Sequence, residues 1–138
     1  MVGLSPWTIG LTAATPVIVV VEDDDALRSA LCFSLGVEGF ATQSFASGEA
    51  LLKAHLTTGC SCFIVDHLLP GMSGLDLLDA LRGAEGLTAP AILITSNPSA
   101  VVRERARRSG VKIVKKPLLD DDVLTTVREL MRAQCAGD

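Results

Sequence analysis

The chain has 138 residues, enough for one compact domain, and hydrophobic residues make up 49% of it, so a core of two or three layers is feasible. The net charge of −4 argues against a general nucleic-acid-binding protein. Residues 1–15 lack the basic start of a signal peptide, and no apolar run reaches the length of a membrane span. We therefore expect a soluble, cytoplasmic protein.

Strands and helices alternate along the predicted chain. Continuous β-branched and apolar residues, as at 17–21, predict strands buried on both faces, and apolar residues three or four positions apart, as at 25–35, predict helices. In chain order the predicted elements are a strand at 17–21, a helix at 25–35, a strand at 40–45, a helix at 48–56, a strand at 62–66, a loop at 68–74, a helix at 75–82, a strand at 91–95, a helix at 100–109, a strand at 111–114 and a helix at 120–133. This alternation predicts an α/β fold with a parallel sheet covered by helices on both faces.

Polar residues follow the predicted strands and define a candidate site. They are Glu22 and Asp23 after the first strand, Asp66 at the end of the third, Thr95 at the end of the fourth and Lys116 after the fifth. Sites in open parallel sheets form beyond the carboxyl ends of the strands, so we expect these groups to converge. Asp24 and Asp25 are better suited to the N-terminus of the next helix, where acids offset the helix dipole.

The charges of the candidate site call for a cation. Glu22, Asp23 and Asp66 would repel one another, and Lys116 balances only one of the three negative charges. A divalent ion would complete neutrality, and ligands that are all oxygen favour Mg²⁺, with Mn²⁺ next. The arrangement suits phosphoryl transfer, with Asp66 as nucleophile and with the cation, Lys116 and Thr95 stabilising the phosphoryl oxygens.

Four segments, VVVEDD, IVDHLLPGMSGLDLL, ILIT and KKP, resemble in order and spacing the receiver domain of two-component response regulators. The resemblance covers residues 16–134, which leaves 1–15 as an N-terminal extension and 135–138 as a C-terminal tail. It implies a flavodoxin-like fold, a doubly wound five-stranded parallel sheet with strand order 2-1-3-4-5. By position, the resemblance implies Asp66 as phosphoacceptor, Glu22, Asp23, Asp66 and the backbone carbonyl of Leu68 as magnesium ligands, Thr95 as switch hydroxyl and Lys116 as phosphate-binding lysine.

The function that this resemblance implies is that of a stand-alone, single-domain response regulator. It would take a phosphoryl group from a sensor histidine kinase or a histidine phosphotransfer protein, and relay the signal by protein contact or onward phosphotransfer. It would catalyse its own phosphorylation and dephosphorylation without turning over an external substrate. Two alternatives stay open: a degenerate receiver that works unphosphorylated, and a small Mg²⁺-dependent phosphohydrolase, although residues 66–68 lack the second acid of a DxD motif.

The chain departs from the receiver pattern in the predicted switching region. Ile113 stands where the family usually has Tyr or Phe, and the segment from Gly110 to Pro117 is about one residue short. Both departures concern signal readout rather than phosphorylation.

Seven of the twelve basic residues fall between positions 103 and 116, where only Glu104 opposes them in the sequence. They are Arg103, Arg105, Arg107, Arg108, Lys112, Lys115 and Lys116. The resemblance implies an output face made by the helix at 100–109, the strand at 111–114 and the helix at 120–133. A solvated helix face and a docking site for an acidic protein partner explain the charges equally well, and a homodimer is a further option. We expect no nucleic-acid or membrane partner.

Histidines and cysteines are weaker candidates. His67 follows Asp66 directly and faces the opposite side of the strand, so packing or surface exposure is expected, and His55 is expected to face water. Cys60 and Cys62 match no common zinc spacing with either histidine, so reduced, buried thiols are the better interpretation.

Overall fold

A computed structural model describes residues 16–54, 61–83, 88–118 and 121–137. Its main sheet has five parallel strands in the spatial order β2-β1-β3-β6-β7. Their bounds are Val17–Val21 for β1, Ala41–Phe45 for β2, Cys62–Asp66 for β3, Ala91–Thr95 for β6 and Lys112–Lys115 for β7. Because β4 and β5 belong to a separate hairpin, this arrangement confirms the predicted order 2-1-3-4-5.

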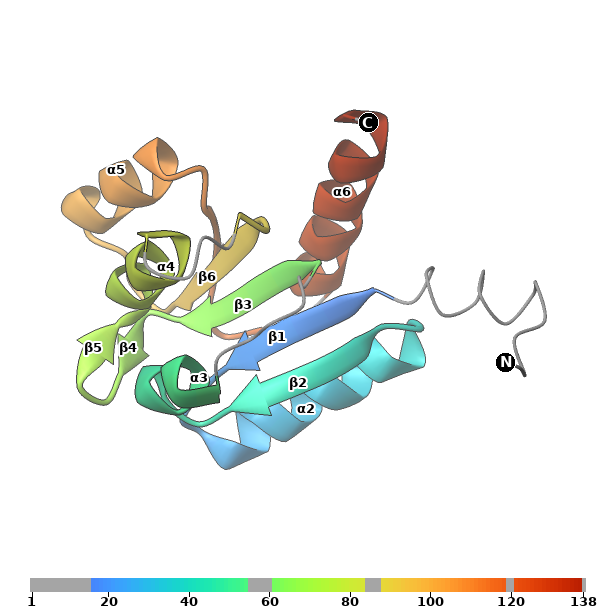
Figure 1. Cartoon of the computed structure of the whole chain (residues 1–138), viewed down its shortest axis with the longest axis horizontal. Coiled ribbons are helices and arrows are strands. Elements are labelled where there is room, and N and C mark those ends of the chain that lie inside the picture. The colour runs from blue at the N-terminus through green and yellow to red at the C-terminus, as the bar shows by residue number, and fades with distance from the viewer. Residues whose placement is uncertain (1–15, 55–60, 84–87, 119–120, 138) are drawn as a thin grey trace.

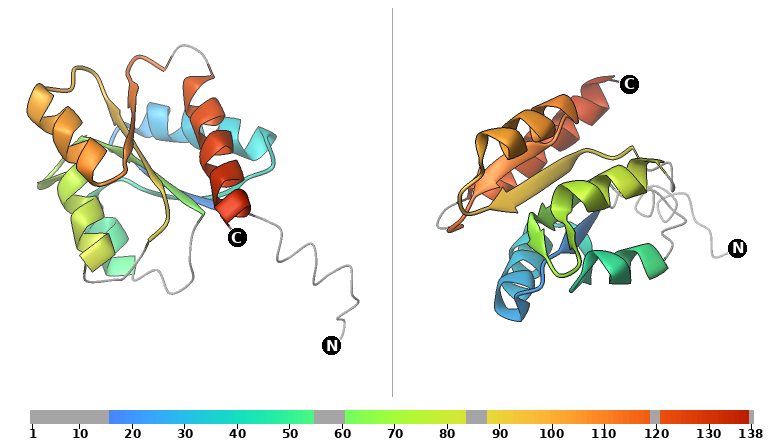
Figure 2. Two further views of the ribbon diagram at one scale, coloured as in Figure 1. Left: turned by 90° about the horizontal axis from the view of Figure 1, so that it is seen from above. Right: turned by 90° about the vertical axis from the view of Figure 1, so that its left-hand side faces the viewer.

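Helices cover both faces of the sheet. Two of them, α2 (Asp25–Val37) and α6 (Asp122–Gly137), lie on one face. Three others, α3 (Gly48–Ala54), α4 (Gly74–Gly83) and α5 (Ala100–Arg108), lie on the opposite face (Figures 1 and 2). Within the described ranges, no helix is long and apolar enough to cross a membrane.

Each face of the sheet has its own hydrophobic core. Alternate residues of β1 point to opposite faces, so Val19 and Val21 pack toward α3, α4 and α5, while Ile18 and Val20 pack toward α2 and α6. All four are buried, which confirms a strand covered on both faces. With both faces covered, the carboxyl ends of the strands remain the place where polar groups can gather.

The acids after β1 also start α2. Asp24 is the N-cap, because its Oδ1 accepts the backbone N–H of Leu27 at 3.0 Å. At the other end, the helix stops before Gly39, whose φ of 96° is readily adopted only by a residue without a Cβ. The backbone N–H of Phe40 then bonds to the carbonyl of Leu35 at 3.0 Å, which closes the last turn.

Several predicted bounds differ from the structure by one or more residues, and three differences bear on the fold. The loop at 68–74 contains a small antiparallel hairpin, β4 (Leu68–Leu69) and β5 (Met72–Ser73), around Gly71 with a φ of 81°. Strand β7 begins after Val111, because the N–H of Val111 bonds to the carbonyl of Ala106 and completes the end of α5. Helix α6 continues through most of the expected C-terminal tail, since no proline interrupts it before Gly137.

Some predictions concern residues outside the described ranges. They include the extension at 1–15, the end of the helix predicted at 48–56, His55 and Cys60. Of the described cysteines, Cys62 is buried and Cys32 half-buried, and neither is in a disulfide, in agreement with reduced thiols.

Candidate functional site

The carboxyl ends of four neighbouring strands meet at one edge of the sheet. Strand β1 is followed by Glu22 and Asp23, β3 ends on Asp66, β6 ends on Thr95, and β7 is followed by Lys116. Parallel pairing aligns these ends, with Val65 opposite Val21 and Lys115 opposite Thr95. The predicted convergence follows directly from this topology.

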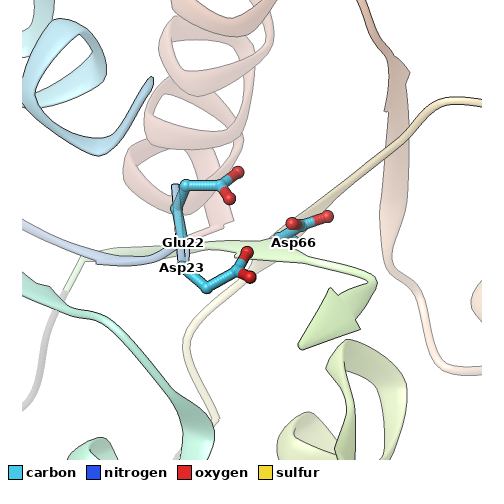
Figure 3. A group of neighbouring side chains, drawn as sticks. All are labelled: Glu22, Asp23 and Asp66. Carbon is cyan, nitrogen blue, oxygen red and sulfur yellow. The ribbon is translucent and has the colours of Figure 1, made fainter. Parts of the chain in front are cut away.

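The three carboxylates form a compact cluster. Glu22, Asp23 and Asp66 each offer a carboxylate oxygen, and these oxygens lie within 4.8 Å of one another. This cluster is the one group of three or more potential metal ligands within the described ranges. Figure 3 shows their carboxylates turned toward a common space, two from the end of β1 and one from the end of β3. Glu22 and Asp66 are buried, whereas Asp23 is exposed. The cluster is thus embedded at the base and open to solvent at its rim.

Lys116 joins two of these acids. Its Nζ lies 3.2 Å from Oδ2 of Asp66 and 3.4 Å from Oε1 of Glu22. The backbone N–H of Lys116 bonds to the carbonyl of Thr95 at 2.9 Å, which anchors the residue to the end of β6. Partial burial lowers the pKa of Lys116, but the neighbouring Asp66 and Glu22 outweigh it and raise the pKa overall. The ammonium therefore stays charged at neutral pH.

Glu22 is the buried acid whose charged form the site disfavours. Burial raises its pKa to about 7; the N–H of Asp24 opposes the rise, Asp66 adds to it, and Lys116 opposes it. The N–H of Asp24 lies 3.0 Å from Oε2, whereas the buried Oε1 has no hydrogen bond and only the Lys116 ion pair beside it. A buried oxygen without a hydrogen bond, in a ligand set made only of oxygens, fits a hard divalent cation.

Thr95 is the last residue of β6, and Leu68 is the second residue after the end of β3. Thr95 is buried at 5% exposure. The backbone N–H of Leu68 is 3.4 Å from Oδ1 of Asp66, so the first residues after β3 curl around the carboxylate. Leu68 itself is 75% exposed.

His67, next to Asp66, is half-buried, in keeping with a packing role. Its backbone N–H bonds to Ile94 and its carbonyl accepts the N–H of Gly74. Its Nδ1 is buried without a hydrogen-bond partner among the described residues.

Sequence reasoning missed two residues that support the site. The guanidinium of Arg28 donates to the backbone carbonyl of Glu22 at 2.8 Å. The two residues are six positions apart, and no sequence pattern at this spacing predicts such a contact. Gly74 packs against Asp66: a Cβ there would lie 2.5 Å from the Asp66 backbone oxygen. The glycine itself was visible in the sequence, but its close approach to β3 was not.

The basic segment, residues 103–116, forms more ion pairs than the sequence indicated. Arg105 lies 2.8 Å from Asp76 and 2.6 Å from Asp79, both on α4, so Glu104 is not the only opposing acid. The hydrogen bonds and charge of Arg105 also hold the pKa of Asp76 below its ordinary value, with the hydrogen bonds of Ser73 adding to the effect. The acids on α4 were missed because residues 26 and 29 positions away come together only through helix packing.

Two other arginines of this segment are also paired. Arg107 and Arg108 both bind Glu104, at 2.6 and 3.1 Å. Ion pairs to other described residues are absent for Arg103, Lys112 and Lys115, and all three are exposed.

The fold and the acidic strand edge define a class, the doubly wound α/β domains with a carboxylate site at the end of the central strands. The sequence matches the family described as "Response regulator receiver domain" over residues 18–128. This chain belongs to the response regulator receiver domain family.

Curated relatives and solved structures agree with this assignment. The chain is 35% identical over 107 residues to the C4-dicarboxylate transport transcriptional regulatory protein DctR of Rhodobacter capsulatus, covering 76% of this chain and 54% of that one. It is 33% identical to the transcriptional regulatory protein FixJ of Azorhizobium caulinodans, covering 79% and 52%. The chain therefore spans about half the length of these relatives.

Among solved structures, a receiver domain protein (CheY-like) from Methanospirillum hungatei JF-1 superposes with a TM-score of 0.80 at 23% identity, covering 91% of this chain and 100% of that one, and shows the shared fold. The receiver domain of the hybrid histidine kinase CckA is 31% identical, with a TM-score of 0.67, and covers 83% and 98%.

Proposed function

We propose that the chain accepts a phosphoryl group on Asp66 from a phosphohistidine donor, in a Mg²⁺-dependent reaction, and relays the signal by protein contact or onward phosphotransfer. One observation carries the proposal. Lys116 Nζ lies 3.2 Å from Oδ2 of Asp66, beside a cluster of three carboxylates at the open edge of the sheet. A cationic donor and a metal-ligand set thus flank the Asp66 carboxylate, which is the arrangement that phosphoryl transfer needs.

In the proposed reaction an Asp66 carboxylate oxygen attacks phosphorus and forms an O–P bond. The P–N bond to the donor histidine breaks, its electron pair stays on the imidazole nitrogen, and that nitrogen takes a proton from solvent. The ammonium of Lys116 balances charge on a phosphoryl oxygen, and the hydroxyl of Thr95 donates a hydrogen bond to another. Hydrolysis of the resulting acyl phosphate would return Asp66 to its carboxylate form.

The proposed cation would be held by the carboxylates of Glu22, Asp23 and Asp66 and by the backbone carbonyl of Leu68. The oxygen-only donor set and the unbonded Oε1 of Glu22 support Mg²⁺, with Mn²⁺ as a substitute. When bound, the ion would neutralise charge on the phosphoryl oxygens as a Lewis acid.

The proposed phosphodonor is a sensor histidine kinase or a histidine phosphotransfer protein. The proposed readout surface is formed by α5, β7 and α6, where Arg103, Lys112 and Lys115 are exposed and lack ion pairs to described residues. These charges favour an acidic segment of a partner protein. Two of the curated relatives are named as transcriptional regulatory proteins.

Phosphorylation of the wild type, Asp66→Asn and Asp79→Asn by acetyl phosphate and Mg²⁺ tests the proposal. Intact-mass spectrometry should show one added phosphoryl group on the wild type and none on Asp66→Asn. Asp79→Asn is the matched control, because it makes the same chemical change at an exposed position of α4. Labelling of Asp66→Asn at the wild-type rate would refute the assignment, and an unlabelled wild type would favour the degenerate receiver.

A further inference from the structure

The metal-binding acids sit on a very short connection. Strand β1 ends at Val21 and α2 begins at Asp25, so Glu22 and Asp23 lie in a link of three residues. The N–H of Glu22 is held by the carbonyl of Phe45 at 3.1 Å. Its carbonyl lies beyond the last residue of β1 that pairs with β3, so it needs another partner.

Arg28 supplies that partner from the first turns of α2. Its Nη1 donates to the Glu22 carbonyl at 2.8 Å, and its Nη2 donates to Oδ1 of Asp25 at 2.6 Å. The Arg28 side chain is only 20% exposed, whereas that of Asp25 is 86% exposed. The guanidinium is therefore fixed at two points and spans the connection from its first residue to the start of the helix.

We propose that Arg28 is a positioning residue for the metal-binding acids, acting through the peptide unit between Glu22 and Asp23. That unit is planar, so a fixed carbonyl direction also fixes the orientation of the bonds to both Cα atoms. The side chains of Glu22 and Asp23 start from those two Cα atoms. The distances from their carboxylates to Asp66 therefore depend on the orientation of this peptide unit. The inference rests on the proposed function, because it concerns the same metal site.

A purely electrostatic role would have the opposite effect. The guanidinium contacts a backbone carbonyl, not the carboxylates of the cluster, and the groups that shift the pKa of Glu22 are Asp24, Asp66 and Lys116 together with burial. If Arg28 acted by charge alone, its removal would take away a cation that repels Mg²⁺ and would tighten metal binding. If it acts by position, its removal weakens metal binding.

The sign of the change can be measured directly. MgCl₂ is titrated into the wild type, Arg28→Ala, Arg28→Lys and Arg107→Ala below their melting temperatures, and Kd is obtained by calorimetry and from amide chemical shifts. We expect Arg28→Ala to raise Kd about tenfold, the loss typical of a residue that orients metal ligands. The Kd of Arg28→Lys for Mg²⁺ should lie between those of the wild type and Arg28→Ala. The lysine ammonium can donate to the Glu22 carbonyl or to Asp25, but it cannot bridge both. Arg107→Ala removes the same charge from the exposed face of α5 and should bind as the wild type.

The outcomes separate this inference from the proposed function. A wild type that binds no Mg²⁺ refutes the metal site and the role of Arg28 together. A wild type that binds Mg²⁺, with Arg28→Ala binding equally or more tightly, refutes only the role of Arg28. Native amide shifts away from residues 22–28 establish that Arg28→Ala is folded. If that variant does not fold, Arg28→Lys decides, and wild-type affinity in Arg28→Lys overturns the inference.

Discussion

Replacing Glu22 by glutamine should remove a pH-dependent loss of folding stability from the metal-free protein. Burial raises the pKa of Glu22 to about 7, with Asp66 adding to the rise and with Asp24 and Lys116 opposing it. Glutamine has nearly the same shape and can still accept the N–H of Asp24, but it carries no charge at any pH. The variant therefore isolates the cost of ionising one buried carboxylate.

The magnitude follows from the two pKa values of Glu22. In the unfolded chain the pKa is 4.5 and in the folded protein it is about 7, so the folded state binds the proton more tightly. The stability that this group contributes is fully present below pH 4.5 and is lost as the pH rises through 7. The full difference corresponds to about 3 kcal/mol, most of it lost between pH 5 and pH 8. For a domain of this size that is roughly 10 °C in melting temperature.

Thermal unfolding followed by circular dichroism, with a chelator and between pH 5 and pH 8, measures this effect. The melting temperature of the wild type should fall as the pH rises, and that of Glu22→Gln should stay nearly level. Glu49→Gln, the same change at a side chain that is 78% exposed, should follow the wild type. Saturating Mg²⁺ should reduce the wild-type fall, because a bound cation favours the carboxylate. An equal fall in Glu22→Gln would show that another group is responsible.

Three further predictions concern the supporting structure. Gly74→Ala places a Cβ 2.5 Å from a backbone oxygen of β3, so urea denaturation should show a loss of about 2 kcal/mol, and wild-type stability would contradict the close approach. Arg105→Gln should raise the pKa of Asp76, measured by NMR, and lower stability by about 1 kcal/mol or less, with a smaller loss at high salt. With beryllium fluoride, amide shifts should be large at residues 95–103 and small in β7, because Ile113 lacks the ring of the usual switch residue; equal shifts would make Ile113 part of the switch.

The sequence by itself determined the order of elements and the residue types of the site. Continuous apolar runs such as 62–66, with helical spacing between them, are local patterns, and they were sufficient for the parallel sheet and its strand order once the family resemblance was added. In a parallel sheet all carboxyl ends lie at one edge, so the acids after β1 and at the end of β3 had to meet. This part of the site needed no knowledge of side-chain packing.

Only the tertiary structure decided how those residues are held and charged. Lys116 reaches Asp66 across 50 positions of sequence, and Arg105 reaches the acids of α4 across 26 and 29. The raised pKa of Glu22 likewise depends on its burial, which is a property of the assembled layers and not of residue 22. The physical reason is the separation in sequence over which each effect acts. Strand and helix periodicity is set by neighbours a few residues apart. Desolvation, ion pairing and the contact of Arg28 with a backbone carbonyl depend on distances that exist only after the helices have packed on the sheet.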